Sequence, residues 1–275
     1  MTELNPYAAP KAHVDDTVSG ADGSFVPDGR AVPGRNGLTW ISDGWIFFRC
    51  QPAMFIAAWF LYYVVTNLVM PQVVPFIGAI VGGFLSVLIS AGVWTGYQAV
   101  HSGERFEFRH LGHGFRERTG TIIKLMLLTS FALLVAILPG MAILGFGFYS
   151  VFSSGVDPQA LQSAGDVGAM IGMIGGAWVY FAIGLLVAIG LIVPVMMAYW
   201  FALPLIVLHD HGARASMKAS FRACLKNMGP FLIYGLAFIP IAILASLPVF
   251  LGWLVAGPLI GTSTYTAYRD IFFSR

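Results

Sequence analysis

The chain has 275 residues, of which 57% are hydrophobic and only 10% are charged, with a formal net charge of +2. Soluble domains carry about 25% charged residues, so this composition excludes an ordinary globular protein with a charged surface. It predicts an integral membrane protein in which lipid covers much of the apolar surface. The apolar runs are continuous rather than alternating, which favours an all-α, polytopic membrane helical bundle.

Residues 1–38 differ from the rest of the chain. They are polar and rich in Pro, Gly, Asp and Ala, so they cannot bury enough apolar surface to offset the entropy of ordering. We expect a disordered cytoplasmic tail over 1–38 and a six-helix transmembrane domain over 39–275. The tail has no basic segment followed by an apolar one, so we expect no cleavable signal peptide, and the first span directs insertion.

Six apolar runs follow the tail, and the one Lys or Arg within them, Lys124, lies near the start of the third. They predict six transmembrane helices, at about 53–70, 75–99, 121–148, 170–200, 230–247 and 249–268. Short links that contain Pro join the first two and the last two runs, so the six helices form three hairpins at about 53–99, 121–200 and 230–268. Prolines within the last four runs predict kinks in those helices.

The positive charges alternate with the spans. All 15 Lys and Arg residues lie before span one, between spans two and three, between spans four and five, or after span six. The links on the other side carry only Asp157 and Asp166. Because positive loops stay on the cytoplasmic side, this pattern predicts that both the N- and the C-terminus are cytoplasmic.

A Phe-Arg step precedes each predicted hairpin. It occurs at Trp45–Arg49, His113–Arg116 and Ser220–Arg222. This recurrence predicts three tandem repeats, each an amphipathic helix followed by a hairpin, all with the same orientation in the membrane.

The third copy shows the clearest pattern. Basic residues recur at every fourth position and an apolar set faces the other side: Arg214, Lys218, Arg222 and Lys226 against Met217, Phe221, Cys224 and Leu225. The second copy sets Phe108, Leu111 and Phe115 against Arg109 and Arg116, and the first supplies Trp40, Ile41, Trp45 and Phe48. Such helices are typical of the membrane interface.

We therefore consider one group of cations as the candidate binding residues for the membrane surface or anionic lipid. The group is Arg49, Arg109, Arg116, Arg214, Lys218, Arg222 and Lys226. One hypothesis is that they form a dedicated site for lipid or a protein partner. The alternative is that they only fix the orientation of the chain and attract anionic lipid generically.

Few residues suggest chemistry. No ionisable residue lies in the middle of a predicted span, which disfavours an ion-coupled pump, and the common enzyme motifs are absent from the sequence. Histidines cluster at His101/His110/His113 and at His209/His211, but no cysteine or carboxylate completes a standard metal-binding spacing. Asp210 is placed to cap the basic helix that follows. We expect no catalytic residue, no cofactor and no metal.

Several segments carry a resemblance to known proteins: Trp45–Arg49, Ala198–Pro204, Ser220–Asn227, Pro230–Gly235 and Tyr268–Phe272. Over about 40–272 the chain resembles a family of uncharacterised proteobacterial inner-membrane proteins, conserved transmembrane proteins of unknown function. It is more distantly similar to the membrane-anchor domain of glycerophosphodiester phosphodiesterases. The resemblance implies a bacterial inner membrane, and it transfers no activity because this sequence lacks the catalytic barrel of those enzymes.

Three functional hypotheses follow. The first is a non-enzymatic inner-membrane protein that organises lipid, or docks a partner, through basic interfacial helices. The second is a passive transporter or channel for a small or lipidic molecule, and the third is a membrane enzyme that would need the histidines to converge. The expected partners are membrane lipids and a protein, either another chain or a second copy of this one, and no nucleic acid.

Overall fold

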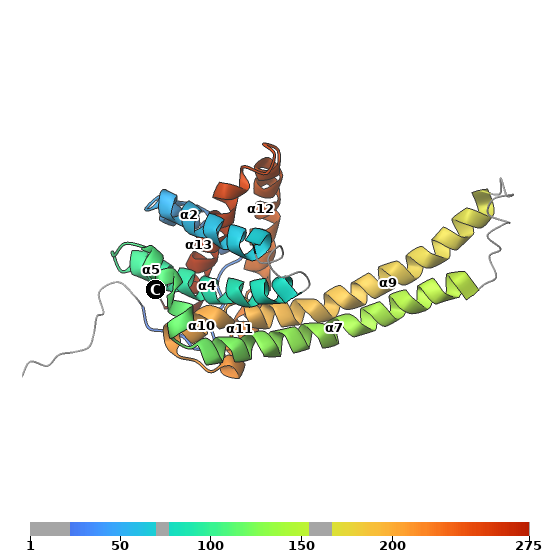
Figure 1. The fold of residues 1–275 in the computed structure, drawn as a ribbon, viewed down its shortest axis with the longest axis horizontal. Helices are drawn as coiled ribbons and strands as arrows, with labels where there is room; N and C mark the ends of the chain where they lie inside the picture. Colours follow the sequence, from blue (N-terminus) through green and yellow to red (C-terminus); the bar gives the residue numbers. More distant parts are fainter. Residues whose placement is uncertain (1–22, 70–76, 154–166, 275) are drawn as a thin grey trace, which may run out of the picture.

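The computed structural model describes residues 23–69, 77–153 and 167–274. Within these residues every regular element is a helix, apart from one isolated antiparallel bridge between Phe25 and Phe273. The all-α prediction is confirmed for this part of the chain. Figure 1 colours the helices along the chain, from blue at the N-terminal end to red at the C-terminal end.

The first hairpin begins with helix α1 (Asn36–Phe48), which is followed by α2 (Pro52–Tyr63). Pro52 stands at the start of α2, where its fixed φ suits a helix and its missing amide costs nothing. The helix continues as the π-helical turn η1 (Val64–Val69), and α4 (Ile77–His101) returns alongside. Helices α1 and α2 meet at an angle of 103°.

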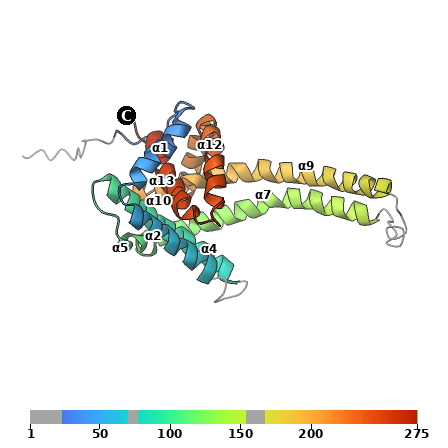
Figure 2. The same ribbon diagram turned by 90° about the horizontal axis from the view of Figure 1, so that it is seen from above.

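The second hairpin is long and projects from the rest of the molecule. Two four-residue helices, α5 (Phe108–Leu111) and α6 (His113–Arg116), lead into α7 (Thr119–Ser153), which pairs with α9 (Val167–Trp200). At 1.5 Å per residue, α7 is about 50 Å long. Figures 1 and 2 show the far part of this pair without neighbours. Most side chains of α9 beyond residue 177 are exposed, and such a long exposed apolar surface is typical of a helix that contacts a membrane or another protein.

The third hairpin contains the central helix of the fold. Helix α10 (Ala202–His209) and the basic helix α11 (Ala213–Lys226) precede α12 (Met228–Ser246) and α13 (Trp253–Phe272). Most residues of α13 are buried, and α13 packs against α1, α2, α4 and α12. Gly44 allows α1 to approach closely, because a Cβ there would lie 2.6 Å from Cα of Ser263 on α13.

Fewer helices than predicted meet the requirements for a membrane span. Four do so by length and hydropathy, at Val81–His101, Thr119–Ser150, Trp178–His209 and Met228–Ser246, and the bent pair α1–α2 gives a fifth. The chain is therefore a multi-pass helical protein with four or five candidate spans among the described residues. Helix α13 does not qualify, because hydroxyl and charged residues lower its hydropathy, and most of its residues are covered by neighbouring helices. Six spans remain a prediction.

The predicted repeat also remains a prediction. Short helices precede each hairpin, but they differ in form: one helix of 13 residues, two of four residues, and α10 followed by a 14-residue helix. The three hairpins do not gather around one axis, since α7 and α9 project away from α12 and α13 over most of their length (Figure 2).

For residues 24–38 the structure replaces the predicted disordered tail with ordered backbone. The amides of Val26 and Arg30 donate hydrogen bonds to the carbonyls of Phe272 and Ile271, each at 2.8 Å, and α1 begins at Asn36. The end of α13 thus supplies the partners that a polar segment lacks on its own. We call residues 24–35 the N-terminal strap. The rest of the predicted tail, residues 1–22, lies outside the described residues.

Candidate functional site

Helix α11 presents its cations on one exposed side. Arg214, Lys218, Arg222 and Lys226 are all exposed, while the opposite side buries small residues such as Ser216, Ala219 and Ala223. The spacing of four therefore predicted the exposed side correctly. The buried side contacts α9 and α10. Ser220 fixes this contact, because its hydroxyl donates to the carbonyl of Met197 at 2.7 Å and accepts from the amide of Phe201 at 2.9 Å.

The apolar side that the sequence predicted for α11 is only partly the buried one. Cys224 is buried and Leu225 is 52% exposed, whereas Met217 and Phe221 are half-buried. Close packing against α9 and α10 requires small side chains, so alanine and serine form the contact and the larger residues flank it. Helix α11 is thus held by the protein, and lipid is not its sole support.

Two of the four cations of α11 bind the N-terminal strap. The Arg222 guanidinium contacts both carboxylate oxygens of Asp28, at 3.0 and 3.1 Å. The Lys226 ammonium donates to the carbonyls of Asp28 and Gly29, at 3.1 and 2.8 Å. Lys218 and Arg214 lie further toward the start of the helix, about one and two turns from Arg222, and both are exposed.

A buried carboxylate anchors the other side of the strap. Asp270 on α13 is 7% exposed and accepts hydrogen bonds from Arg30 at 2.9 Å, from Asn36 at 2.6 Å and from the indole of Trp40 at 3.0 Å. A buried charge requires such partners. The sequence analysis did not predict this group. The one indication in the sequence was a carboxylate in the last turn of a helix that is otherwise rich in apolar and aromatic residues.

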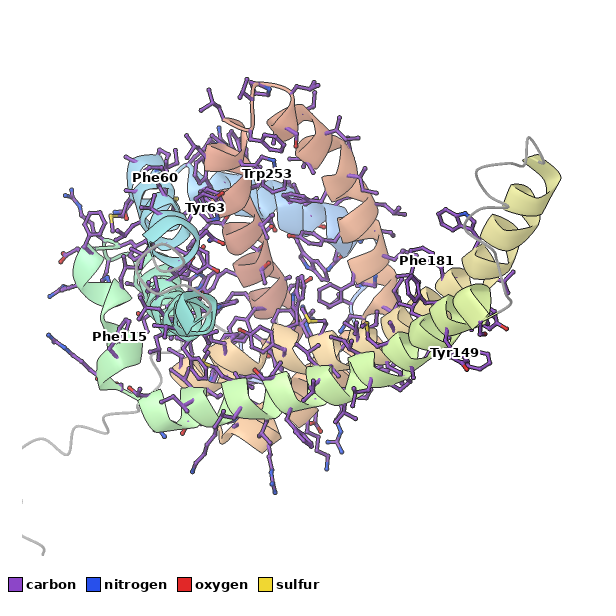
Figure 3. All side chains as sticks on the ribbon, turned by 45° about the vertical axis from the view of Figure 1, so that its right-hand side comes forward. Phe60, Tyr63, Phe115, Tyr149, Phe181 and Trp253 are labelled. Carbon is purple, nitrogen blue, oxygen red and sulfur yellow. The ribbon has the colours of Figure 1, made fainter. Side chains whose placement is uncertain are left out.

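The remaining predicted cations lie on the other short helices. Arg109 on α5 pairs with Glu107 at 2.9 Å, Arg116 ends α6 and is exposed, and Arg49 is exposed at the bend between α1 and α2. The aromatic residues of these helices divide between core and surface: Trp40 and Phe48 are buried, whereas Phe115 is 45% exposed and points outward near the start of α7 (Figure 3).

Polar contacts join the three segments that precede the hairpins. The amide of Phe106 donates to the side-chain oxygen of Gln51 at 2.9 Å, which joins the approach to α5 to the start of α2. An ion pair between Arg118 and Asp210 joins the start of α7 to the link between α10 and α11. Asp210 does not cap α11 as the sequence suggested. It ends α10 with a φ of 58°, and Gly212 stands at the start of α11.

A groove runs between the start of α7 and the start of α11. Its volume is about 630 Å³. Eight residues line it: Thr121, Lys124, Leu127, Leu128, Gly212, Ala213, Arg214 and Ala215. The groove therefore combines two cations with two leucines. Of the two cations in the groove, only Arg214 belongs to the predicted set. Lys124 lies in another hairpin, and only the tertiary structure brings that part of the chain to α11.

Two further cavities lie between hairpins. One of about 300 Å³ is lined largely by aromatic rings of α2 and α4 and by glycines of α13, including Trp59, Trp94 and Gly257. The other, of about 400 Å³, lies between α4, α7 and α9 and includes Thr129 and Tyr199.

The histidines do not converge. Among the described residues, no group of three or more His, Cys, Asp or Glu side chains could hold a metal ion. His209 instead stacks on Phe25 of the strap, with ring centroids 3.8 Å apart, and hydrogen-bonds the hydroxyl of Tyr268. These contacts are structural and attach the strap to the end of α10.

Comparison with known proteins gives one informative match. The chain is 28% identical over 225 residues to a protein of Burkholderia thailandensis that is named a probable inner membrane protein, and the match covers 77% of this chain and 75% of that relative. No protein-family model matches the chain, and no solved structure matches it significantly. The relative and the long apolar helices together support a multi-pass location in the inner membrane.

Proposed function

We propose that this protein is a non-enzymatic inner-membrane protein that holds anionic lipid at one membrane surface through its basic short helices. The observation that carries this proposal is the side of α11 that bears the exposed cations Arg214 and Lys218. Because the opposite side of α11 is packed against α9 and α10, these cations are held at a fixed place. Each cation near an anionic membrane surface contributes about 1 kcal/mol of attraction.

The position of this surface relative to the bilayer supports the proposal. Lys124 is the last cation of α7, and α7 continues without a charged residue to Ser153. Figure 3 shows Phe115 near the start of α7 and Tyr149 far along it. The 31 residues from Thr119 to Tyr149 correspond to about 45 Å of helix, close to the thickness of a bilayer with its headgroups. The start of α7 would therefore lie at the headgroups.

The orientation is part of the proposal. The hydroxyls of Ser24 and Ser274 lie 2.9 Å apart, so both ends of the described chain reach the same side. The charge pattern of the links favours the cytoplasm for that side. The basic surface would then face the cytoplasmic leaflet, on the same side as both ends of the described chain.

The test is lipid selection by the purified chain in nanodiscs of mixed phosphatidylglycerol and phosphatidylcholine. The test variant replaces Arg116, Lys124, Arg214 and Lys218 with Gln, and leaves Arg222 and Lys226 to hold the strap. The control keeps the charge at the same four positions by exchanging the cations, as Arg116→Lys, Lys124→Arg, Arg214→Lys and Lys218→Arg. We expect the wild type and the control to enrich phosphatidylglycerol, and the test variant to approach the mixing ratio. Equal enrichment in all three proteins would contradict the proposal.

The cavities between hairpins favour a second candidate function, passive passage or storage of a lipidic molecule. The cavity at Trp59 and Trp94 has room for part of an acyl chain, and its lining is mostly apolar. Replacing Ser90, which lines this cavity, with Phe would fill it. If the protein moves a fluorescent lipid between leaflets of reconstituted vesicles, the Ser90→Phe variant should lose that activity. Vesicles whose lipid movement does not depend on the protein would refute this second candidate.

A further inference from the structure

We infer that the groove between α7 and α11 binds one anionic glycerophospholipid, with its phosphate between Lys124 and Arg214 and an acyl chain against Leu127 and Leu128. The inference rests on the proposed function and adds one defined site to it. A general basic surface would only enrich anionic lipid around the protein, whereas this groove would retain a single molecule.

The charges of the groove match a phosphate. Its lining contains the cations Lys124 and Arg214 and no carboxylate. Asp210 is close in sequence to Arg214, but its carboxylate forms an ion pair with Arg118, so it does not neutralise the two cations of the groove. Lysine offers three donors and arginine a planar fork, and both form strong, charge-assisted hydrogen bonds with phosphate oxygens. The hydroxyl of Thr121 on the same wall adds one more donor.

The start of α11 increases the positive potential of the groove. Gly212 stands at the helix start and no side chain caps it, so the first amides of α11 have no side-chain partner. The partial positive charge of a helix start favours an anion. This contribution is secondary to the two side chains. It also disfavours a choline or ethanolamine headgroup, whose positive end would meet three positive groups.

The apolar part of the groove selects a lipid over a free phosphate. Leu127 and Leu128 follow Lys124 by about one helical turn, in the direction of the charge-free part of α7. Leu127 is 56% exposed, so more than half of its surface is available for contact with a ligand. A molecule with a phosphate at Lys124 and hydrocarbon one turn further along α7 would satisfy both parts. The volume of about 630 Å³ has room for a headgroup and the beginning of its chains.

The inference can be tested by counting tightly held lipid. The full chain, purified from mixed phosphatidylglycerol and phosphatidylcholine, is analysed by native mass spectrometry, and phosphatidylglycerol is titrated onto delipidated protein. We expect one phosphatidylglycerol to be retained by the wild type. Each cation near a phosphate accounts for about fivefold in affinity, so Lys124→Gln with Arg214→Gln should weaken the apparent Kd about thirtyfold.

Two further variants separate this site from general attraction. Lys218→Gln removes a cation of the same helix outside the groove and should leave the tight site within about twofold of the wild type. Ala215→Trp keeps both cations but fills the groove, so it should also weaken retention. Inorganic phosphate at millimolar concentration should not compete, because it lacks the chains that contact the leucines.

The outcomes distinguish the site from the proposed function. If the groove variants hold phosphatidylglycerol as tightly as the Lys218→Gln control does, the inference fails. If the four-cation variant described above still loses its lipid enrichment, the proposed function nevertheless stands. If no variant changes lipid selection, both fail together. Equal retention of phosphatidylcholine by the wild type would also overturn the inference, because charge would then play no part.

Discussion

The carboxylate of Asp270 should control how firmly the N-terminal strap is attached to the fold. It accepts hydrogen bonds from Arg30, Asn36 and Trp40, and its side chain is 5% exposed. In the variant Asp270→Asn the remaining side-chain oxygen can still accept a hydrogen bond. The new NH2 group, however, faces hydrogen-bond donors, and the negative charge is lost. Hydrogen bonds to a charged group contribute about 1.5–3 kcal/mol each. Arg30 is one-third exposed and can be rehydrated, so we expect a total loss of about 3 kcal/mol.

Limited trypsinolysis measures this loss directly. Cleavage after Arg30 requires the strap to open, because the Arg30 carbonyl accepts a hydrogen bond from Asn227 and the Arg30 amide donates to Ile271. When opening is fast relative to cleavage, the rate follows the open population. A loss of about 3 kcal/mol then predicts cleavage about 100-fold faster. The matched control Asp43→Asn, at an exposed acid of α1, should change the rate less than twofold.

The reasoning would be refuted if folded Asp270→Asn protein were cut after Arg30 as slowly as the wild type. Should that variant fail to fold, Asn36→Ala provides the same test on a smaller scale. It removes one donor from the carboxylate and leaves Arg30 and Trp40 in place, so cleavage should rise about tenfold.

Three further predictions concern other parts of the fold. Burial raises the pKa of the Cys224 thiol to about 12, against a smaller opposing effect of its hydrogen bond with Ser220. At pH 8 a maleimide should therefore label the exposed Cys50 at least tenfold faster than the buried Cys224. Denaturation in detergent should remove this difference in labelling rate. Gly44→Leu should lower the thermal midpoint by several degrees because α13 occupies the space of the new side chain, whereas Gly145→Ala, which meets nothing within 4 Å, should not. Asn227→Ala should accelerate trypsin cleavage in the strap at least tenfold, because the buried amide bonds the strap backbone on both sides; cleavage at the wild-type rate would contradict this.

Much of the fold follows from local patterns in the sequence. The apolar runs at 121–148 and 170–200 lie within α7 and α9, and the spacing of four on α11 predicted which of its residues are exposed. These features depend only on neighbours within a few turns of the same helix, so periodicity and hydropathy contain them. The predicted span at 249–268 corresponds to α13, yet its burial between other helices does not follow from its composition.

The strap and the groove could not be predicted in the same way. Asp270 and Arg30 are 240 residues apart, and no local pattern indicates that they meet. A polar segment that is unable to bury apolar surface resembles a disordered tail until its distant partners are known. Likewise, Lys124 appears in the sequence as one more cation near the end of a span, and only the packing of α7 against α11 places it in the same groove as Arg214.

The long hairpin explains how lipid would reach the groove. Helices α7 and α9 contact each other along their length, but beyond their first turns from the body they have few protein neighbours, as Figures 1 and 2 show. Leu127, Phe131 and Leu134 continue the exposed apolar surface of α7 away from Lys124. A lipid in the bilayer could therefore move along this surface to the groove without crossing any protein barrier. The groove needs no gate for that reason, and its selectivity would depend on charge at the headgroup, since the hydrocarbon it contacts is common to every phospholipid.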